Sequence, residues 1–69
     1  NTVITDDFSF TASDKGNVSV FNLNGQLVRE LNFTQGFQNI NLSNLNTSVY
    51  IARFTNSEGI SSNVKIIKQ

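Results

Sequence analysis

Apolar and polar residues alternate with a period of two through most of this 69-residue chain. Val18 and Val20, for example, are separated by Ser19. Successive side chains of a β-strand point to opposite faces, so this period is typical of strands that bury one face. Turn residues interrupt the pattern at intervals of about 8 to 12 residues, which is the spacing of antiparallel sandwiches and small barrels. The sequence therefore predicts an all-β fold.

The alternation predicts six strands. They cover residues 8–10, 17–23, 26–33, 37–42, 49–55 and 60–68. A helix is the alternative for residues 26–33, because Leu27, Val28 and Leu31 also fit a helical stripe. That segment is shorter than the roughly 12 to 15 residues at which isolated helices become marginally stable, so we favour the strand.

Two turns carry clear signals. Asn24 and Gly25 stand between two alternating runs, and this pair tolerates the two positive φ angles of a type I′ hairpin. Asn56 and Gly59 take the first and last positions of a second turn. We interpret all four residues as structural turn residues.

Two further segments are expected to connect strands. Residues 12–16 predict a turn in which Gly16 adopts positive φ. Residues 43–48 contain Leu45 as their one apolar side chain, as expected of a loop that crosses between two sheets with one buried anchor.

One face of each strand supplies the predicted core. Its members are Phe8, Phe10, Val18, Val20, Leu27, Leu31, Phe33, Ile40, Leu42, Leu45, Tyr50, Ala52, Phe54, Val64 and Ile66. Ile60 is also expected to point inward, whereas Lys65 and Ile67 should point to the opposite face of the last strand.

Composition excludes several function classes. Five Lys and Arg balance five Asp and Glu, so the chain lacks the basic excess that attracts nucleic acid. His and Cys are absent, which removes the usual general base, thiolate nucleophile and zinc ligands. We expect no cofactor and no required metal.

The carboxylates offer little chemistry. Asp6 and Asp7 are adjacent, so on a strand they would point to opposite faces. Asp14, Glu30 and Glu58 fall at turns or on polar faces, and the spacing of a calcium loop is missing. Solvated surface carboxylates are the better interpretation, so we predict that the protein is not an enzyme.

The order of the segments adds a resemblance. The segments are Val18-Ser-Val-Phe-Asn-Leu-Asn-Gly-Gln-Leu-Val28, Ile40-Asn-Leu-Ser-Asn-Leu45, Val49-Tyr50-Ile51, Asn56-Ser-Glu-Gly59 and Lys65-Ile-Ile-Lys-Gln69. Together they resemble the type A C-terminal sorting domain of the type IX secretion system of Bacteroidetes. The resemblance covers about residues 8–69 and implies a small Ig-like β-sandwich of six to seven strands.

The resemblance also implies a role. Such domains direct a cargo, fused at their N-terminus, from the periplasm across the outer membrane to the cell surface or the medium. The implied partners are the outer-membrane translocon, its shuttle protein and a sortase-like protease that commonly removes the domain. The family's recognition element would map to Lys65, Ile66, Ile67 and Lys68, and Tyr50 matches a family aromatic. We expect residues 1–69 to be a single domain at the end of a larger secreted protein.

Recognition by strand pairing would need a free strand. We therefore expect residues 60–68 to form an exposed or loosely held edge whose backbone and Ile67 face contact the receptor. The alternative is a retained adhesion or carbohydrate-binding module, with Tyr50, Phe21 and Phe37 stacking on a sugar, although core positions are the better interpretation of these aromatics. A structural spacer is a third possibility.

Overall fold

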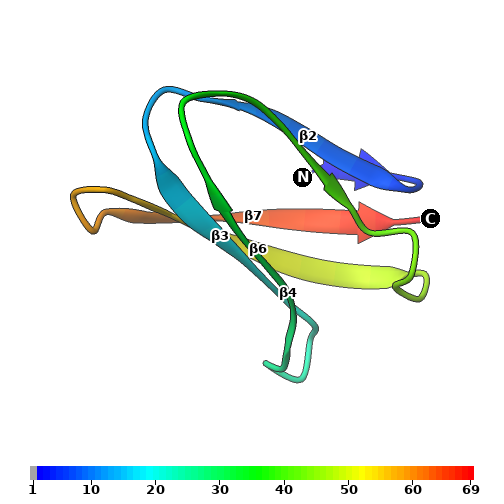
Figure 1. The fold of residues 1–69 in the computed structure, drawn as a ribbon. Coiled ribbons are helices and arrows are strands. Elements are labelled where there is room, and N and C mark those ends of the chain that lie inside the picture. Colours follow the sequence, from blue (N-terminus) through cyan, green and yellow to red (C-terminus); the bar gives the residue numbers. More distant parts are fainter. Residues whose placement is uncertain (1) are drawn as a thin grey trace.

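The computed structural model describes residues 2–69, so Asn1, the first residue of the expected domain, lies outside it. The described chain forms seven strands and no helix (Figure 1). The strands are β1 (Thr2–Ile4), β2 (Asp7–Ala12), β3 (Gly16–Phe21), β4 (Leu27–Phe33), β5 (Gly36–Asn41), β6 (Ser48–Asn56) and β7 (Ser61–Lys68). The predicted all-β class is confirmed. All six predicted strands are present, and β1 is additional, because three residues are too few to show a period.

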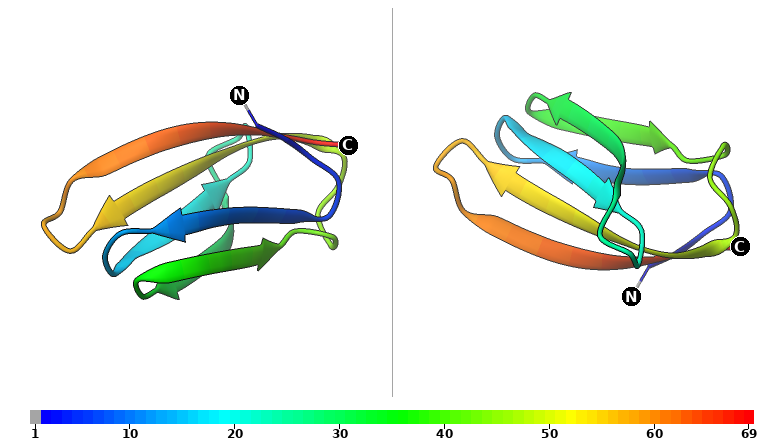
Figure 2. Two further views of the ribbon diagram at one scale, coloured as in Figure 1. Left: turned by 90° about the horizontal axis from the view of Figure 1, so that it is seen from above. Right: turned by 90° about the horizontal axis from the view of Figure 1, so that it is seen from below.

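The strands form two sheets that pack face to face (Figure 2). The larger sheet has the order β1-β7-β6-β3-β4, and the smaller one pairs β2 with β5. The turn spacing allows either a sandwich or a small barrel, and the fold is the β-sandwich. Neighbouring strands are antiparallel except β1 and β7, which run parallel. Apolar side chains on the facing surfaces meet between the sheets.

The core lies between these layers and contains most of the predicted residues. The buried ones are Phe8, Val18, Val20, Ile40, Leu42, Tyr50, Ala52 and Ile66, and those partly buried against them are Phe10, Leu31, Phe33, Leu45, Phe54 and Val64. The pattern missed Ile4 and Ala12, which are also buried. The prediction that Ile60 points inward is wrong, because Ile60 lies between the turn of residues 56–59 and β7 and is 64% exposed.

Leu27 is the second error in the predicted core, because it is 52% exposed. The cause is a β-bulge. Val20 lies opposite Arg29 and Phe21 lies opposite Leu27, so Val28 is an extra residue without a partner on β3. An extra residue shifts the strand's side chains to the other face. Val28 therefore packs against the core and Leu27 points outward.

The hairpin between β3 and β4 is confirmed, but its turn type is wrong. Gly25 has a φ of 84°, whereas Asn24 has no positive φ, so the turn is not type I′. Gly25 N–H donates to the Asn22 carbonyl at 3.0 Å, and the side-chain oxygen of Asn22 accepts from the backbone N–H groups of Asn24 and Gln26. This is a type I turn followed by a left-handed glycine. Asn22, not Asn24, holds it.

The predicted turn at Asn56 and Gly59 is confirmed and repeats this arrangement. Gly59 has a φ of 82° and donates its N–H to the Asn56 carbonyl at 3.0 Å. The Asn56 side-chain oxygen accepts from the backbone N–H groups of Glu58 and Ile60. Asparagine at the first position therefore closes both hairpins in the same way.

The two other predicted connections are present. A turn joins β2 to β3, but Gly16 is wrong as its positive-φ residue: it is the first residue of β3, and its φ is not positive. The crossing loop carries the chain from β5 in the smaller sheet to β6 in the larger one. Leu45 is its half-buried anchor and donates its backbone N–H to the Leu42 carbonyl at 3.0 Å.

Candidate recognition surface

The C-terminal half of β7 is held on both sides. Ile66, Ile67 and Lys68 lie opposite Tyr50, Val49 and Ser48 of β6, and opposite the three residues of β1 on the other side. The expectation of a free or loosely held last strand is therefore wrong for this half. The physical reason is β1, whose parallel pairing covers the edge. Among residues 2–69, the first part of β7, Ser61 to Lys65, pairs with β6 alone.

Alternation divides the four C-terminal residues between two faces. Ile66 points into the core with none of its surface exposed, and Lys68 is 6% exposed. Lys65 is exposed and Ile67 is half-buried on the outer face of the sheet. The outward direction predicted for Lys65 and Ile67 is confirmed. These two side chains are thus the ones that an incoming protein reaches first.

Tyr50 serves the fold. The residue is 4% exposed, and its hydroxyl donates to the Asn46 carbonyl at 2.7 Å. A tyrosine hydroxyl bonded to the backbone a few residues upstream is a known corner of immunoglobulin-like sandwiches. This bond fixes the crossing loop against the start of β6.

The three aromatics of the carbohydrate-binding alternative do not meet on one surface. Tyr50 is in the core, as the structural interpretation predicted. Phe21 is half-buried on the outer face of the larger sheet, while Phe37 is 71% exposed on β5 of the smaller sheet. A core position is therefore wrong for both Phe21 and Phe37. The structure offers no shared aromatic platform from these residues.

The comparison with known families identifies the chain. A family model described as "Secretion system C-terminal sorting domain" matches residues 3–69. The chain belongs to this family. Neither the curated proteins nor the solved structures gave a match.

The family is the C-terminal sorting domain of type IX secretion, and it implies a source in Bacteroidetes. Membership supports a sorting signal that takes part in export to the cell surface or the medium. It also implies contact with the type IX machinery and an N-terminal cargo. Residues 2–69 of the sorting domain contain no helix that could span a bilayer.

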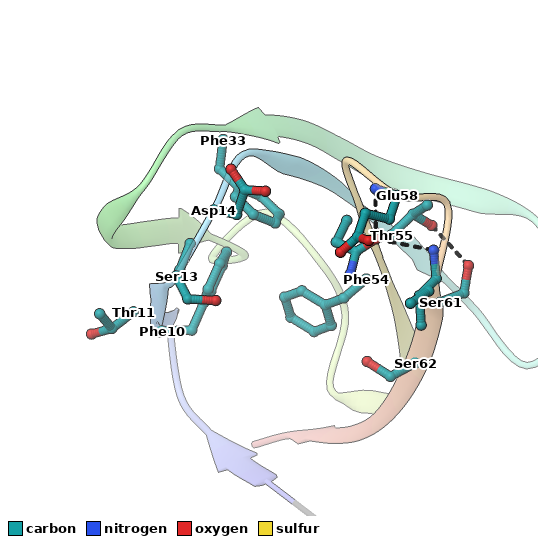
Figure 3. Close-up of a pocket in the computed structure, with 13 residues that line it drawn as sticks. Phe10, Thr11, Ser13, Asp14, Phe33, Phe54, Thr55, Glu58, Ser61 and Ser62 are labelled. Carbon is teal, nitrogen blue, oxygen red and sulfur yellow. Dashed lines mark hydrogen bonds between the residues drawn. The ribbon is translucent and has the colours of Figure 1, made fainter.

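One hollow of the sorting domain lies at the end of the sandwich near the β2–β3 and β6–β7 turns (Figure 3). Its volume is about 450 Å³. Phe10 packs edge-to-face against both Phe33 and Phe54, with ring centroids 5.1 Å and 5.0 Å apart. Asp14 and Glu58 are the carboxylates of the lining. Within residues 2–69, acidic side chains do not gather into a group of three that could hold a metal ion.

Asp14 links the two turns at this end. Ser57 Oγ donates to Asp14 Oδ2 at 2.6 Å, and the Lys15 N–H donates to Oδ1 at 2.8 Å. The Ser57 bond, and then the Lys15 bond, hold the pKa of Asp14 below its ordinary value of 3.8. Because the folded-state pKa is depressed, the ionised group stabilises the fold above pH 3.8, and this contribution is lost as the pH falls through the folded-state pKa.

Ser57→Ala should raise the pKa of Asp14 toward 3.8, because it removes the largest cause of the depression. Carboxyl-carbon NMR titration of the folded sorting domain measures this change. Ser13→Ala is the matched control, since Ser13 lines the same hollow without a hydrogen bond to Asp14. An unchanged Asp14 titration in Ser57→Ala would show that the link does not persist in solution.

Proposed function

We propose that this chain directs an N-terminally fused cargo across the outer membrane through the type IX system and performs no catalysis itself. The cargo reaches the periplasm first, and the domain is then read by the translocon and its shuttle protein. A sortase-like protease removes the domain afterwards. The observation that carries the proposal is the family match over residues 3–69. In this proposal, residues 1–69 act as one domain at the end of a larger secreted protein.

We assign recognition to Lys65, Ile66, Ile67 and Lys68, with two different tasks. Lys65 and Ile67 contact the receptor, because their side chains lie on the outer face. Ile66 and Lys68 point inward and keep the strand in place. The receptor thus reads side chains on a fixed strand, since both backbone edges of this half are already paired.

The test is a secretion assay. A signal peptide, a fluorescent protein and this chain are fused in that order and expressed in a type IX-competent host. Removing residues 65–69 would be a poor variant, because it also removes Ile66 from the core and unpairs β1. The double variant Lys65→Gln, Ile67→Thr changes only outward side chains, and threonine keeps the strand preference of isoleucine.

The unchanged chain should carry fluorescence outside the cell, while the double variant should leave it in the periplasm. Lys15→Gln with Phe37→Thr is the matched control, because both residues are exposed and lie elsewhere. Thermal melting of each purified chain separates lost recognition from lost folding. Export of the double variant at the level of the unchanged chain would contradict the assignment of Lys65 and Ile67.

A further inference from the structure

The outer face of the larger sheet carries an apolar band that continues from Ile67. Ile67 lies opposite Val49 on one side and Val3 on the other, so these three side chains share a face. In the next row, Ile51 lies opposite Phe21, and Phe21 lies opposite Leu27. We name this surface the apolar band; its members are Val3, Phe21, Leu27, Val49, Ile51 and Ile67.

The rest of the same face is polar. The remaining rows contain Asn17, Ser19, Glu30, Asn32, Arg53, Thr55, Ser61 and Asn63. One face of a sandwich sheet normally meets water and carries polar residues, so these rows follow the rule and the apolar band departs from it. Val3 is 56% exposed and Leu27 is 52% exposed. A contiguous apolar surface of this kind marks an interaction site.

The apolar band borders a hollow of about 390 Å³. Phe21, Leu23 and Ile51 supply its apolar lining, and Arg53 and Asn63 its polar side. Leu23 is 69% exposed, in the turn after β3. The hollow can therefore receive an apolar side chain of a partner. A residue next to that side chain in the partner would then contact the Arg53 guanidinium.

The charges of this face point to the chemistry of the partner. Lys65 lies opposite Ile51, and Arg53 lines the hollow, so these two exposed cations border the apolar band. Asp6, Asp7, Asp14 and Glu58 lie in turns or in the smaller sheet. Glu30 is the one carboxylate in these rows, two strands from Arg53 at about 10 Å, and it accepts a hydrogen bond from Ser19.

These charges disfavour two other occupants. A second copy docked through the same face would bring two cations and one carboxylate from each chain into one interface, and this excess of positive charge is repulsive. An anionic membrane would gain only about 1 kcal/mol from each cation near its surface, and this face presents two. A protein that combines apolar side chains with carboxylates fits both features.

We propose that the apolar band, with Lys65 and Arg53, is one continuous docking surface for a partner protein that presents apolar side chains bordered by carboxylates. The inference rests on the proposed function, because it places this partner in the type IX machinery. It extends the recognised surface from the C-terminal residues across β6 and β3 to β4.

The experiment changes the end of the apolar band that is farthest from β7. Phe21→Thr with Leu27→Thr leaves residues 65–68 intact, and Arg53→Glu reverses one bordering charge. In the secretion assay, each should lower export about tenfold, as removal of a central interface contact does. Phe37→Thr is the control, because Phe37 is 71% exposed on the other sheet, and its export should equal that of the unchanged chain. Thermal melting must show that all the variants are folded.

The outcomes separate the two proposals. If the double variant Phe21→Thr, Leu27→Thr is exported normally while Lys65→Gln, Ile67→Thr is retained, the signal is confined to the C-terminal residues and the docking surface is overturned, but the proposed function stands. If the unchanged chain is not exported, the proposed function fails, and the inference fails with it.

Two measurements on the purified chain test the other occupants. Sedimentation with vesicles of phosphatidylcholine and phosphatidylglycerol at 3:1 should show no binding, and analytical ultracentrifugation should show a monomer. Vesicle binding, or a dimer, that is lost in Phe21→Thr, Leu27→Thr would assign the apolar band to lipid or to a second copy and overturn the proposal.

Discussion

Gly16→Ala should lower the free energy of unfolding by about 3 kcal/mol, the upper part of the usual range for forcing atoms into a packed site. Gly16 pairs with Phe33 on one side and Asn56 on the other. A Cβ at this position would clash with the carbonyl oxygen of Thr55, and it would lie 3.0 Å from the Phe33 ring and 3.2 Å from the Asn56 Cα. Two of these three neighbours are backbone atoms, so the strands themselves would have to move apart.

Gly25→Ala is the matched control for Gly16→Ala. Gly25 has a φ of 84°, but a Cβ there would have nothing within 4 Å. Its cost is therefore conformational, about 1 kcal/mol. In thermal melts of a domain of this size, the losses of about 3 and about 1 kcal/mol correspond to decreases in Tm of about 12–24 °C and about 4–8 °C. Equal shifts would show that β3 does not approach β6 this closely in solution.

Ile66→Ala should lower the free energy of unfolding by about 3 kcal/mol, because it removes a buried side chain and leaves a cavity. Ile66 is fully buried between the sheets, next to Tyr50 on the neighbouring strand. Chemical denaturation of the purified chain measures the loss. Ile66→Val, with an expected loss of about 1 kcal/mol, keeps the comparison measurable if the alanine variant fails to fold.

Ile67→Ala distinguishes the role of Ile67 from that of the neighbouring Ile66. Ile67 is half-buried on the outer face, so its loss should be about 1 kcal/mol or less. The pair thus dissociates folding from recognition: Ile66→Ala should reduce export through unfolding, and Ile67→Ala should reduce export while the domain remains folded. A larger destabilisation by Ile67→Ala than by Ile66→Ala would contradict the described facing of β7.

Much of the sandwich follows from the sequence because its signals are local. The alternation of Val18 and Val20 about Ser19 places two side chains in the core without knowledge of the partner strand. The first hairpin was predicted from the adjacent pair Asn24-Gly25 and the second from Asn56 and Gly59, although Asn22 rather than Asn24 supplies the closing side chain of the first. Turn type depends on φ angles, and residue identity constrains them only loosely.

The errors arise where partners distant in the sequence decide the structure. The bulge at Val28 reverses Leu27 because β4 must keep its register with β3, and a single-strand pattern contains no such information. Gly16 is needed for the close approach of β6, some forty residues later in the chain. β1 covers the expected free edge through parallel pairing with β7. No turn residue in the sequence indicates this pairing, because the two strands are not joined by a turn.

The candidate surface was predictable only in part. Alternation within β7 placed Lys65 and Ile67 on the outer face, and the family resemblance pointed to the segment of residues 65–68 that contains them. The continuation of that surface across Ile51 to Phe21 needs the order of the strands and the register between them. Each strand alone shows one or two apolar residues on its polar face, which is unremarkable for a surface.

The position of β7 between β1 and β6 has a consequence for the timing of folding. The larger sheet cannot assemble in chain order during synthesis, because β7, its second strand in space, is made after the other six described strands. Until then β6 has an open edge, and β1 has nothing to pair with. Such distant pairing slows folding relative to local contacts. A polypeptide that stops short of β7 therefore lacks both the pairing partner of β1 and the outward side chains of Lys65 and Ile67.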